Sequence, residues 1–206
     1  MISIDNYRKL FKQEIDFVAG AMTIKSLPKF TFPQIAFVGK SNVGKSSLIN
    51  AICNRKALAR VSHTPGRTQQ INFFSVGGRF LLVDLPGYGY AKVSHKRQND
   101  WEKLITHYLF DRRPDLVNLL IDSRRGIKEH DEAVIDMIIS NNIPIQIVFT
   151  KCDEIKDYEI LKTNASNFFH QKYNIDIDII FTSTRSKEGA QTLQNSFHKY
   201  ITGTSR

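Results

Sequence analysis

Residues 39–46 read GKSNVGKS, which is glycine, four variable residues, glycine, lysine and serine. The pattern follows the apolar run QIAFVG and opens the helix-like run KSSLINAIC, the context that a phosphate-binding loop requires. Its glycines would let backbone N–H groups face phosphate oxygens, and the helix that follows would add its positive dipole end. Lys45 would contact the β- and γ-phosphates, and the Ser46 hydroxyl would ligate Mg²⁺. The predicted nucleotide ligands are Gly39, Lys40, Ser41, Asn42, Val43, Gly44, Lys45, Ser46 and Ser47.

A glycine- and serine-rich turn without a ligand is the alternative, and it does not explain the strand before the motif and the helix after it.

The segment DLPGYGYAKV, residues 84–93, begins where the run RFLLVD ends. Asp84 could bind Mg²⁺ through water, and the Gly87 N–H could meet a γ-phosphate. In Ras-like switches a glutamine follows that glycine and orients the attacking water. Here the next residue is Tyr88, which has no carboxamide, so the sequence assigns no catalytic residue.

Two further polar segments, TKCD at 150–153 and TST at 182–184, each end an apolar run. The Asp153 carboxylate could accept hydrogen bonds from guanine's ring N–H and exocyclic amine, a donor pair that adenine lacks. The Lys151 stem would lie across the base, and backbone N–H groups near Ser183 and Thr184 would face the guanine carbonyl. The predicted base-binding residues are Thr150, Lys151, Asp153, Thr182, Ser183 and Thr184, with a solvated turn at 150–153 as the alternative.

The elements that must position these residues alternate between apolar strand-like runs and helical patterns. The runs QINFFSV and RFLLVD flank Gly77 and Gly78, which predicts a hairpin. Residues 7–19 are compatible with a short helix. We therefore expect an α/β fold with a six-stranded, mostly parallel sheet, one antiparallel edge strand and helices on both faces. A parallel sheet would gather the motifs at its carboxyl edge.

The chain has 206 residues, a length that suits one domain. Its net charge of +9 favours a polyanionic partner such as RNA. Basic residues recur beside the motifs, at Arg55, Lys56, Arg60, Arg67, Lys92, Lys96, Arg97, Arg124 and Arg125. A scatter of solvated charges is the alternative. The two cysteines are isolated, which disfavours a zinc site or a disulfide framework. No apolar run is long enough to span a membrane and no signal sequence is recognisable, so we expect a cytoplasmic location.

Together, GKSNVGKSSLIN, TPGRTQQINFF, DLPGYGYAKV and TKCD resemble the EngB-type GTP-binding proteins, in the Era-like branch of the Ras-like P-loop GTPases. The resemblance begins at about Pro33, so residues 1–32 are interpreted as an extension packed on a Ras-like domain at 33–206. It implies GTP-dependent assembly of the large ribosomal subunit through rRNA or pre-ribosome contact, and a link to cell cycle and septation. Residues 63–67 would form a loop that orders on nucleotide binding, with Gly66 near the nucleotide. Thr68 matches a switch I threonine that closes over Mg²⁺.

The resemblance also suggests a compensation for the missing glutamine. In related GTPases an asparagine at the position of Asn42 helps to hold K⁺ beside the phosphates, where the ion neutralises developing charge. The alternative is that Asn42 only caps or braces its loop. Thr150 stands where the family pattern has asparagine, and we expect it to brace the loop.

The leading functional interpretation is a GTP-binding, slowly hydrolysing, monomeric switch that uses Mg²⁺. A GTP-sensing RNA-binding module with negligible turnover is the second. A GTPase of tRNA modification or of a membrane is the third, and the sequence shows no extra catalytic or amphipathic segment for it.

Overall fold

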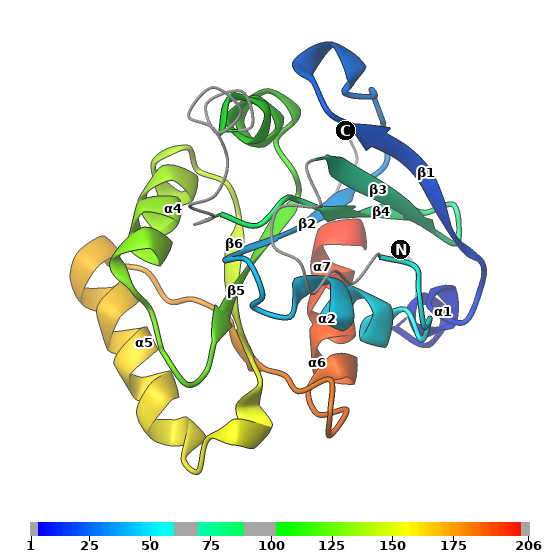
Figure 1. Ribbon diagram of the computed structural model, residues 1–206. Coiled ribbons are helices and arrows are strands. Elements are labelled where there is room, and N and C mark those ends of the chain that lie inside the picture. The colour runs from blue at the N-terminus through cyan, green and yellow to red at the C-terminus, as the bar shows by residue number, and fades with distance from the viewer. Residues whose placement is uncertain (1–3, 60–69, 89–101, 203–206) are drawn as a thin grey trace.

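The computed structural model describes residues 4–59, 70–88 and 102–202 (Figure 1). Its strands are β1 (Ile15–Ala21), β2 (Gln34–Gly39), β3 (Ile71–Val76), β4 (Phe80–Asp84), β5 (Leu116–Asp122), β6 (Ile145–Thr150) and β7 (Ile179–Phe181). Its α-helices are α1 (Ile4–Leu10), α2 (Lys45–Ile52), α4 (Glu129–Ser140), α5 (Tyr158–Tyr173), α6 (Ala190–Ser196) and α7 (His198–Thr202). Residues 102–107 are also helical and continue into a π-helical turn, η2 (Tyr108–Arg112). Two 3-10 turns complete the list, η1 (Ile24–Ser26) and η3 (Cys152–Glu154).

The strands form one sheet in the order β1-β3-β4-β2-β5-β6-β7. All neighbouring pairs from β4 to β7 in that order are parallel, whereas β3 is antiparallel to both β1 and β4. The carboxyl ends of β2, β4, β5, β6 and β7 therefore lie at one edge of the sheet. That edge carries the predicted motifs.

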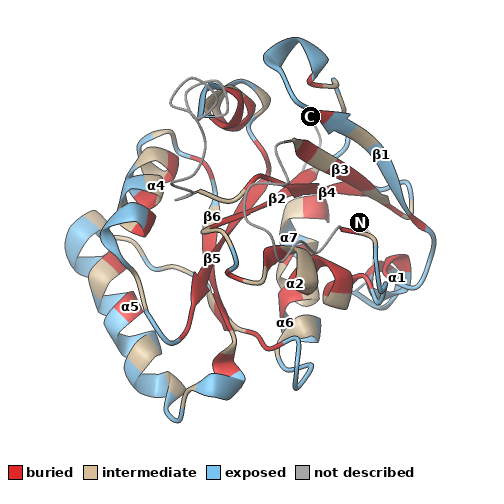
Figure 2. Ribbon diagram, in the orientation of Figure 1, coloured by how far each residue is buried: buried red, intermediate tan, exposed pale blue. Residues whose placement is uncertain are grey.

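Helices cover both faces of the sheet, as expected (Figure 1). On one face, α1, α2, α6 and α7 contribute to a core that includes Phe37, Leu48 and Phe197. On the other face, α4, α5 and the segment 102–112 contribute to a core that includes Phe149, Phe169 and Tyr108. Every residue of β2, β4 and β5 is buried (Figure 2), which suits parallel strands covered on both faces.

The prediction of six strands is wrong by one, because the N-terminal helix ends at Leu10 and residues Ile15–Ala21 form β1. The sequence IDFVAGA carries β-branched and aromatic residues that favour a strand, and β1 pairs along the whole of β3. The antiparallel strand is therefore β3, which lies one place in from the edge, and β1 is the edge strand.

The segment 1–32, interpreted as an extension, contributes this strand and the helix α1. Tyr7 of α1 is fully buried, and its hydroxyl donates to the Gln194 carbonyl at 2.5 Å. The boundary at residue 33 stays a prediction.

The predicted hairpin is present between β3 and β4. Gly77 and Gly78 have φ values of 54° and 63°, the left-handed conformation that a tight hairpin turn requires. The hairpin aligns Asn72 with Asp84 and so places Asp84 at the sheet edge.

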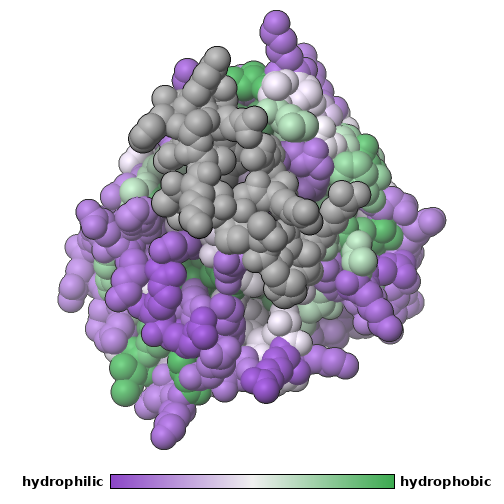
Figure 3. All heavy atoms as spheres, in the orientation of Figure 1, coloured by the Kyte–Doolittle hydropathy of each residue, from purple (hydrophilic) through white to green (hydrophobic). Residues whose placement is uncertain are grey.

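Hydrophilic side chains predominate over α4 and α5 in the space-filling view, with apolar ones at the lower end of α5, and apolar side chains also gather on the side of β1 (Figure 3). Phe17 and Val18 of β1 are among the exposed apolar residues. None of the helices in the described ranges is both long enough and apolar enough to span a bilayer.

Candidate nucleotide-binding site

The predicted phosphate loop joins the end of β2 at Gly39 to the start of α2 at Lys45. Asn42 and Gly44 have φ values of 64° and 101°, so the loop alternates into the left-handed region twice. Such alternation turns successive N–H groups toward one side and forms an anion-binding concavity. Gly39 is required by space, because a Cβ there would lie 2.9 Å from the Leu120 carbonyl oxygen. The loop has the geometry of a phosphate cradle.

Lys45 and Asp84 form an ion pair within this site. Lys45 is 8% exposed and Asp84 is 1% exposed, so water screens the pair little. Asp84 reaches this position because β4 runs beside β2, with Asp84 opposite Phe37. A phosphate group would compete with the Asp84 carboxylate for the Lys45 ammonium.

Ser46 and Asp84 fit the chemistry of Mg²⁺, which prefers oxygen ligands. Ser46 is the second residue of α2 and Asp84 ends the neighbouring strand, so both donors belong to the same corner of the sheet edge. Within the described residues, no three His, Cys, Asp or Glu side chains are grouped for a metal ion. Among the described residues Ser46 and Asp84 would hold Mg²⁺, and its other ligands would come from phosphates, water and the predicted Thr68. Gly66 and Thr68 lie outside the described residues.

The backbone after Asp84 folds onto the phosphate loop. The Tyr88 N–H donates to the Gly39 carbonyl at 3.2 Å, and the Ser41 N–H donates to the Tyr88 carbonyl at 3.1 Å. Gly87 lies so near the loop that a Cβ would be 3.1 Å from the Ser41 nitrogen. The predicted γ-phosphate sensor is therefore in direct contact with the loop that would hold the phosphate.

The Tyr88 side chain points toward the start of α4. Its hydroxyl donates to Asp131 Oδ1 at 2.5 Å, and Asp131 Oδ2 accepts the Lys128 N–H at 2.9 Å. Burial, followed by the hydrogen bond to Asp131, raises the pKa of Tyr88 well above its usual value. Tyr88 thus acts here as an anchor on α4.

Thr150, at the end of β6, braces the phosphate loop as expected. Its hydroxyl lies 2.7 Å from the Val43 carbonyl and 3.3 Å from the Ile121 carbonyl. A threonine hydroxyl can therefore support the loop from the position that the family pattern gives to asparagine.

Lys151 follows at once and has a φ of 58°. Its ammonium donates to the Asn42 carbonyl at 3.2 Å and to Asp122 Oδ2 at 2.9 Å. The side chain consequently extends from the base-recognition segment to the phosphate loop. The presence of asparagine at position 42 has a local explanation. Asparagine tolerates the left-handed conformation found there, and the Asn42 backbone carbonyl accepts a hydrogen bond from the Lys151 ammonium.

Asp153 lies in η3 and is exposed, so its carboxylate is accessible to a base. The Cys152 N–H donates to the Thr182 carbonyl at 3.2 Å, which joins η3 to the segment after β7. Thr182 and Ser183 are buried and Thr184 is exposed. The structure thus brings the two predicted base-binding segments side by side.

Of the backbone N–H groups expected to face the base, the one of Ser183 is engaged elsewhere, and the one of Thr184 stays a prediction. The Ser183 N–H donates to the Glu188 carbonyl at 3.1 Å and so does not face outward toward a base carbonyl. The cause is a tight turn, in which the Ser183 hydroxyl also accepts the N–H groups of Arg185 and Ser186.

Sequence reasoning missed Asp122 and Asp131. Asp122 ends β5 and is 7% exposed, with Lys151 and Arg124 on its carboxylate. Burial alone would raise its pKa, but hydrogen bonds from Arg124 and Lys151 hold the pKa well below the usual value. The signal was available, because Asp122 ends the apolar run DLVNLLID as Asp84 ends RFLLVD. Asp131 had no such signal, since its role depends on where Tyr88 points.

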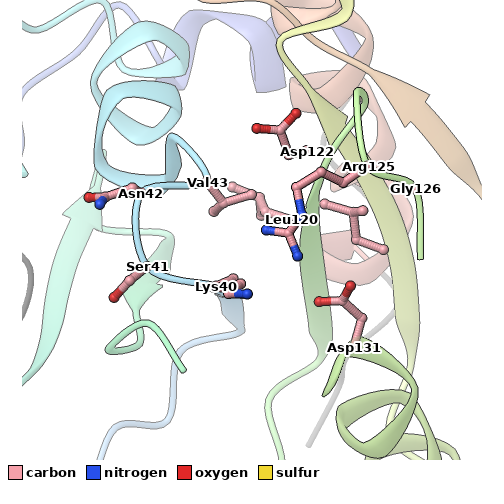
Figure 4. Close-up of a pocket in the computed structure, with 10 residues that line it drawn as sticks. Lys40, Ser41, Asn42, Val43, Leu120, Asp122, Arg125, Gly126 and Asp131 are labelled. Atoms are coloured by element: carbon pink, nitrogen blue, oxygen red, sulfur yellow. The ribbon is translucent and has the colours of Figure 1, made fainter. Parts of the chain in front are cut away.

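A small pocket separates the phosphate loop from the end of β5 and the start of α4 (Figure 4). Asp122, Arg125 and Asp131 line it on one side, and the loop residues from Lys40 to Val43 line it on the other. The Ser41 and Asn42 side chains point away from it.

The predicted basic surface is tested in part. Arg55 and Lys56 are exposed after α2, whereas Arg124 forms ion pairs with Asp122 and Glu154. Arg60, Arg67, Lys92, Lys96 and Arg97 lie outside the described residues.

Comparison with known proteins agrees with this geometry. The family described as "50S ribosome-binding GTPase" matches residues 34–151. The "Probable GTP-binding protein EngB" of Rickettsia bellii (strain OSU 85-389) is 56% identical over 196 residues, covering 94% of this chain and 91% of the relative. The protein of the same name from Rickettsia prowazekii (strain Madrid E) is 52% identical over 200 residues, covering 97% and 92%.

Two solved structures show the fold. A crystal structure of a probable GTP-binding protein EngB matches with a TM-score of 0.64 and 22% identity over 83% of this chain and 99% of that chain. Era in complex with MgGDPNP and part of 16S ribosomal RNA matches with a TM-score of 0.67 and 22% identity, over 84% and 58%. The fold is that of Ras-like GTPases. With its phosphate loop and its EngB relatives, the chain belongs to the EngB family of GTP-binding proteins, within the 50S ribosome-binding GTPases.

Proposed function

We propose that this protein binds GTP with Mg²⁺, hydrolyses it slowly in the cytosol, and acts as a monomeric switch in assembly of the large ribosomal subunit through rRNA or pre-ribosome contact. Membership of the EngB family supports GTP binding and GTPase activity. The family description names the 50S ribosome, and the net charge of +9 suits a polyanionic partner. Septation and cell-cycle effects would follow indirectly from ribosome supply.

The observation that carries the proposal is the direct bonding between the base-recognition segment and the phosphate loop. Thr150 and Val43 are 107 residues apart in sequence and lie 2.7 Å apart between Oγ1 and the carbonyl oxygen. Lys151 reaches the Asn42 carbonyl of the same loop. One nucleotide can therefore occupy both segments, with its phosphates in the loop and its base beside Asp153.

The position of Tyr88 supports the proposal of slow hydrolysis. Its hydroxyl is bonded to Asp131 at the start of α4, so it is not aimed at a phosphate-bound water. Water would have to be positioned by switch backbone groups or by a partner, which is why a ribosomal particle is the expected activator. A K⁺ ion beside Asn42 is the further element of this proposal, and it supplies charge neutralisation without a side chain.

The base assignment is tested by Asp153→Asn. The carboxylate accepts from two guanine donors, whereas an asparagine amide would offer one acceptor and one donor, the pattern that suits xanthine. We expect GDP affinity to fall by about a hundredfold or more and affinity for xanthosine diphosphate to rise. Asp136→Asn, on the outer side of α4 and bonded to Tyr173, makes the same change in charge and should leave both affinities unaltered. Unchanged guanine preference in Asp153→Asn would contradict the assignment.

The ribosomal assignment is tested by GTP turnover in potassium buffer with large-subunit precursor particles, with small-subunit particles as the control. We expect stimulation by the large-subunit particles only. Equal turnover with and without particles would overturn the assignment of the trigger and would favour the GTP-sensing RNA-binding module with negligible turnover. Repeating the assay in sodium buffer tests the K⁺ element, since a K⁺ site predicts a loss of turnover there.

A further inference from the structure

We propose that Asp122 is a positioning residue for guanine recognition. One of its carboxylate oxygens fixes Lys151, and its contact with Arg124, which also binds Glu154, fixes the turn that carries Asp153. This inference rests on the proposed function, because it assigns a role at the same base site.

The first observation is the place of Asp122 in the sheet. It ends β5 directly opposite Thr150 of β6, and the Ser123 N–H donates to the Thr150 carbonyl at 2.9 Å. Asp122 therefore stands on a rigid strand beside the residue before Lys151. Asp122 is 7% exposed, so a carboxylate without a cationic partner at this position would cost free energy.

The second observation is the contact with Lys151. The ammonium donates to Asp122 Oδ2 at 2.9 Å and to the Asn42 carbonyl at 3.2 Å. Two acceptors from different elements hold the end of a side chain that otherwise has many rotamers. The aliphatic stem, which would lie against the base, is therefore oriented before a nucleotide arrives, and the binding step loses less side-chain entropy.

The third observation is the bridge to η3. Arg124 donates to Asp122 Oδ1 from Nε at 2.8 Å and to Oδ2 from Nη2 at 2.6 Å. Its Nη1 donates to Glu154 Oε2 at 2.9 Å. Glu154 is the residue after Asp153 in η3, so this paired guanidinium ties the base-reading turn to the end of β5.

The charges of this group balance. Asp122 and Glu154 supply two carboxylates, and Arg124 and Lys151 supply two cations. Both Asp122 oxygens are engaged by these cations, so Asp122 is not available as a metal ligand or a general base in this arrangement.

The test measures GDP and IDP affinity and GDP release in the full-length protein, with fluorescent nucleotide analogues. IDP lacks the exocyclic amine, so the ratio of the two affinities reports how well Asp153 is placed. We expect Asp122→Asn to release GDP about tenfold faster and to lower the preference for GDP over IDP severalfold. A purely structural Asp122 would lower the unfolding midpoint and leave the GDP-to-IDP preference of the folded protein unaltered, which would overturn the proposal.

Two further variants keep the test decisive if Asp122→Asn fails to fold. Glu154 and Arg124 have side chains that are 40% and 45% exposed, so Glu154→Gln and Arg124→Gln should fold, and each should lower the GDP-to-IDP preference. Asp136→Asn, which makes the same loss of a carboxylate outside the site, should not change it. If neither Glu154→Gln nor Arg124→Gln changes the preference, the bridge has no role in base reading and the proposal fails. A wild-type protein that does not prefer guanine to adenine nucleotides would instead overturn the proposed function itself.

Discussion

The two halves of the sheet edge are built differently. At the base half, Thr150 and Lys151 are bonded to the phosphate loop, and Lys151 is also bonded to Asp122. At the phosphate half, Lys45 is paired with Asp84, and the Ser41 N–H is bonded to Tyr88. These are the groups that would have to meet phosphates and Mg²⁺. The base half is therefore already assembled in this structure, whereas binding of phosphates and Mg²⁺ at the phosphate half would require these contacts to be exchanged.

The largest effect is expected from Gly189→Ala, in the turn that joins the base-binding segment 182–184 to α6. Gly189 has a φ of 72°, and a Cβ there would lie 1.8 Å from the Phe181 carbonyl oxygen. Since backbone must move, we expect a loss of about 3 kcal/mol or more in the free energy of unfolding, measured by urea denaturation. Gly87→Ala at the phosphate half is the matched comparison, because its nearest contact would be 3.1 Å, and it should cost less than about 1 kcal/mol. Equal costs would contradict the difference in rigidity.

Thr150→Val should have the next largest effect. It keeps the shape of the side chain and removes the hydroxyl that bonds to the Val43 carbonyl, so that this contact between β6 and the phosphate loop is lost. We expect GDP to dissociate about tenfold faster, as measured by displacement of a fluorescent analogue. Thr150→Ser retains the hydroxyl and should remain close to the wild type. Identical release from the valine variant would show that the loop needs no support from β6.

Tyr88→Phe sharpens the comparison at the phosphate half. It removes the hydrogen bond to Asp131 and keeps the ring, so Gly87 and Tyr88 should leave the phosphate loop more readily. We expect affinity for a non-hydrolysable GTP analogue to rise by a few-fold relative to GDP, with basal turnover nearly unchanged. Titration calorimetry with the two nucleotides measures this ratio. A large fall in basal turnover would instead make the Tyr88 hydroxyl part of the hydrolytic machinery.

The smallest effect is a pH dependence at Asp122. Its folded-state pKa lies below the ordinary value of 3.8, so its contribution to stability is present above that value and is lost as the pH falls toward the folded-state pKa. The difference in unfolding free energy between wild type and Asp122→Asn should therefore stay constant from about pH 7 to pH 5 and shrink below pH 4. A difference that grows on acidification would contradict the assigned direction.

Much of this architecture was predictable from sequence because its local signals agree. The phosphate loop follows an apolar strand-like run and opens a helix-like one, and the hairpin turn at Gly77 and Gly78 joins two strand-like runs. The strand β1 was missed because residues 7–19 also fit a short helix, and because this edge strand buries only Ile15 and Ala21 at its two ends. Only pairing with β3 decides its conformation.

The features of the candidate site also fall into those that the sequence could locate and those that it could not. Residues that end strands, such as Asp84 and Thr150, could be located from chain order, because parallel strands share one carboxyl edge. Contacts that depend on side-chain direction could not. The bond from Tyr88 to Asp131 and the ion pair of Lys45 with Asp84 join residues 43 and 39 positions apart, and neither spacing has a sequence signature.

The central claim is that base reading is preassembled and phosphate sensing is not. Amide hydrogen exchange, resolved to single residues in the nucleotide-free, GDP-bound and GTP-analogue-bound protein, tests it directly. The amide of Cys152, bonded to Thr182, should be protected in all three states, whereas the amides of Ser41 and Tyr88 should change in protection between GDP and the GTP analogue. Protection of Cys152 that appears only with nucleotide, together with constant protection of Ser41 and Tyr88, would contradict the account.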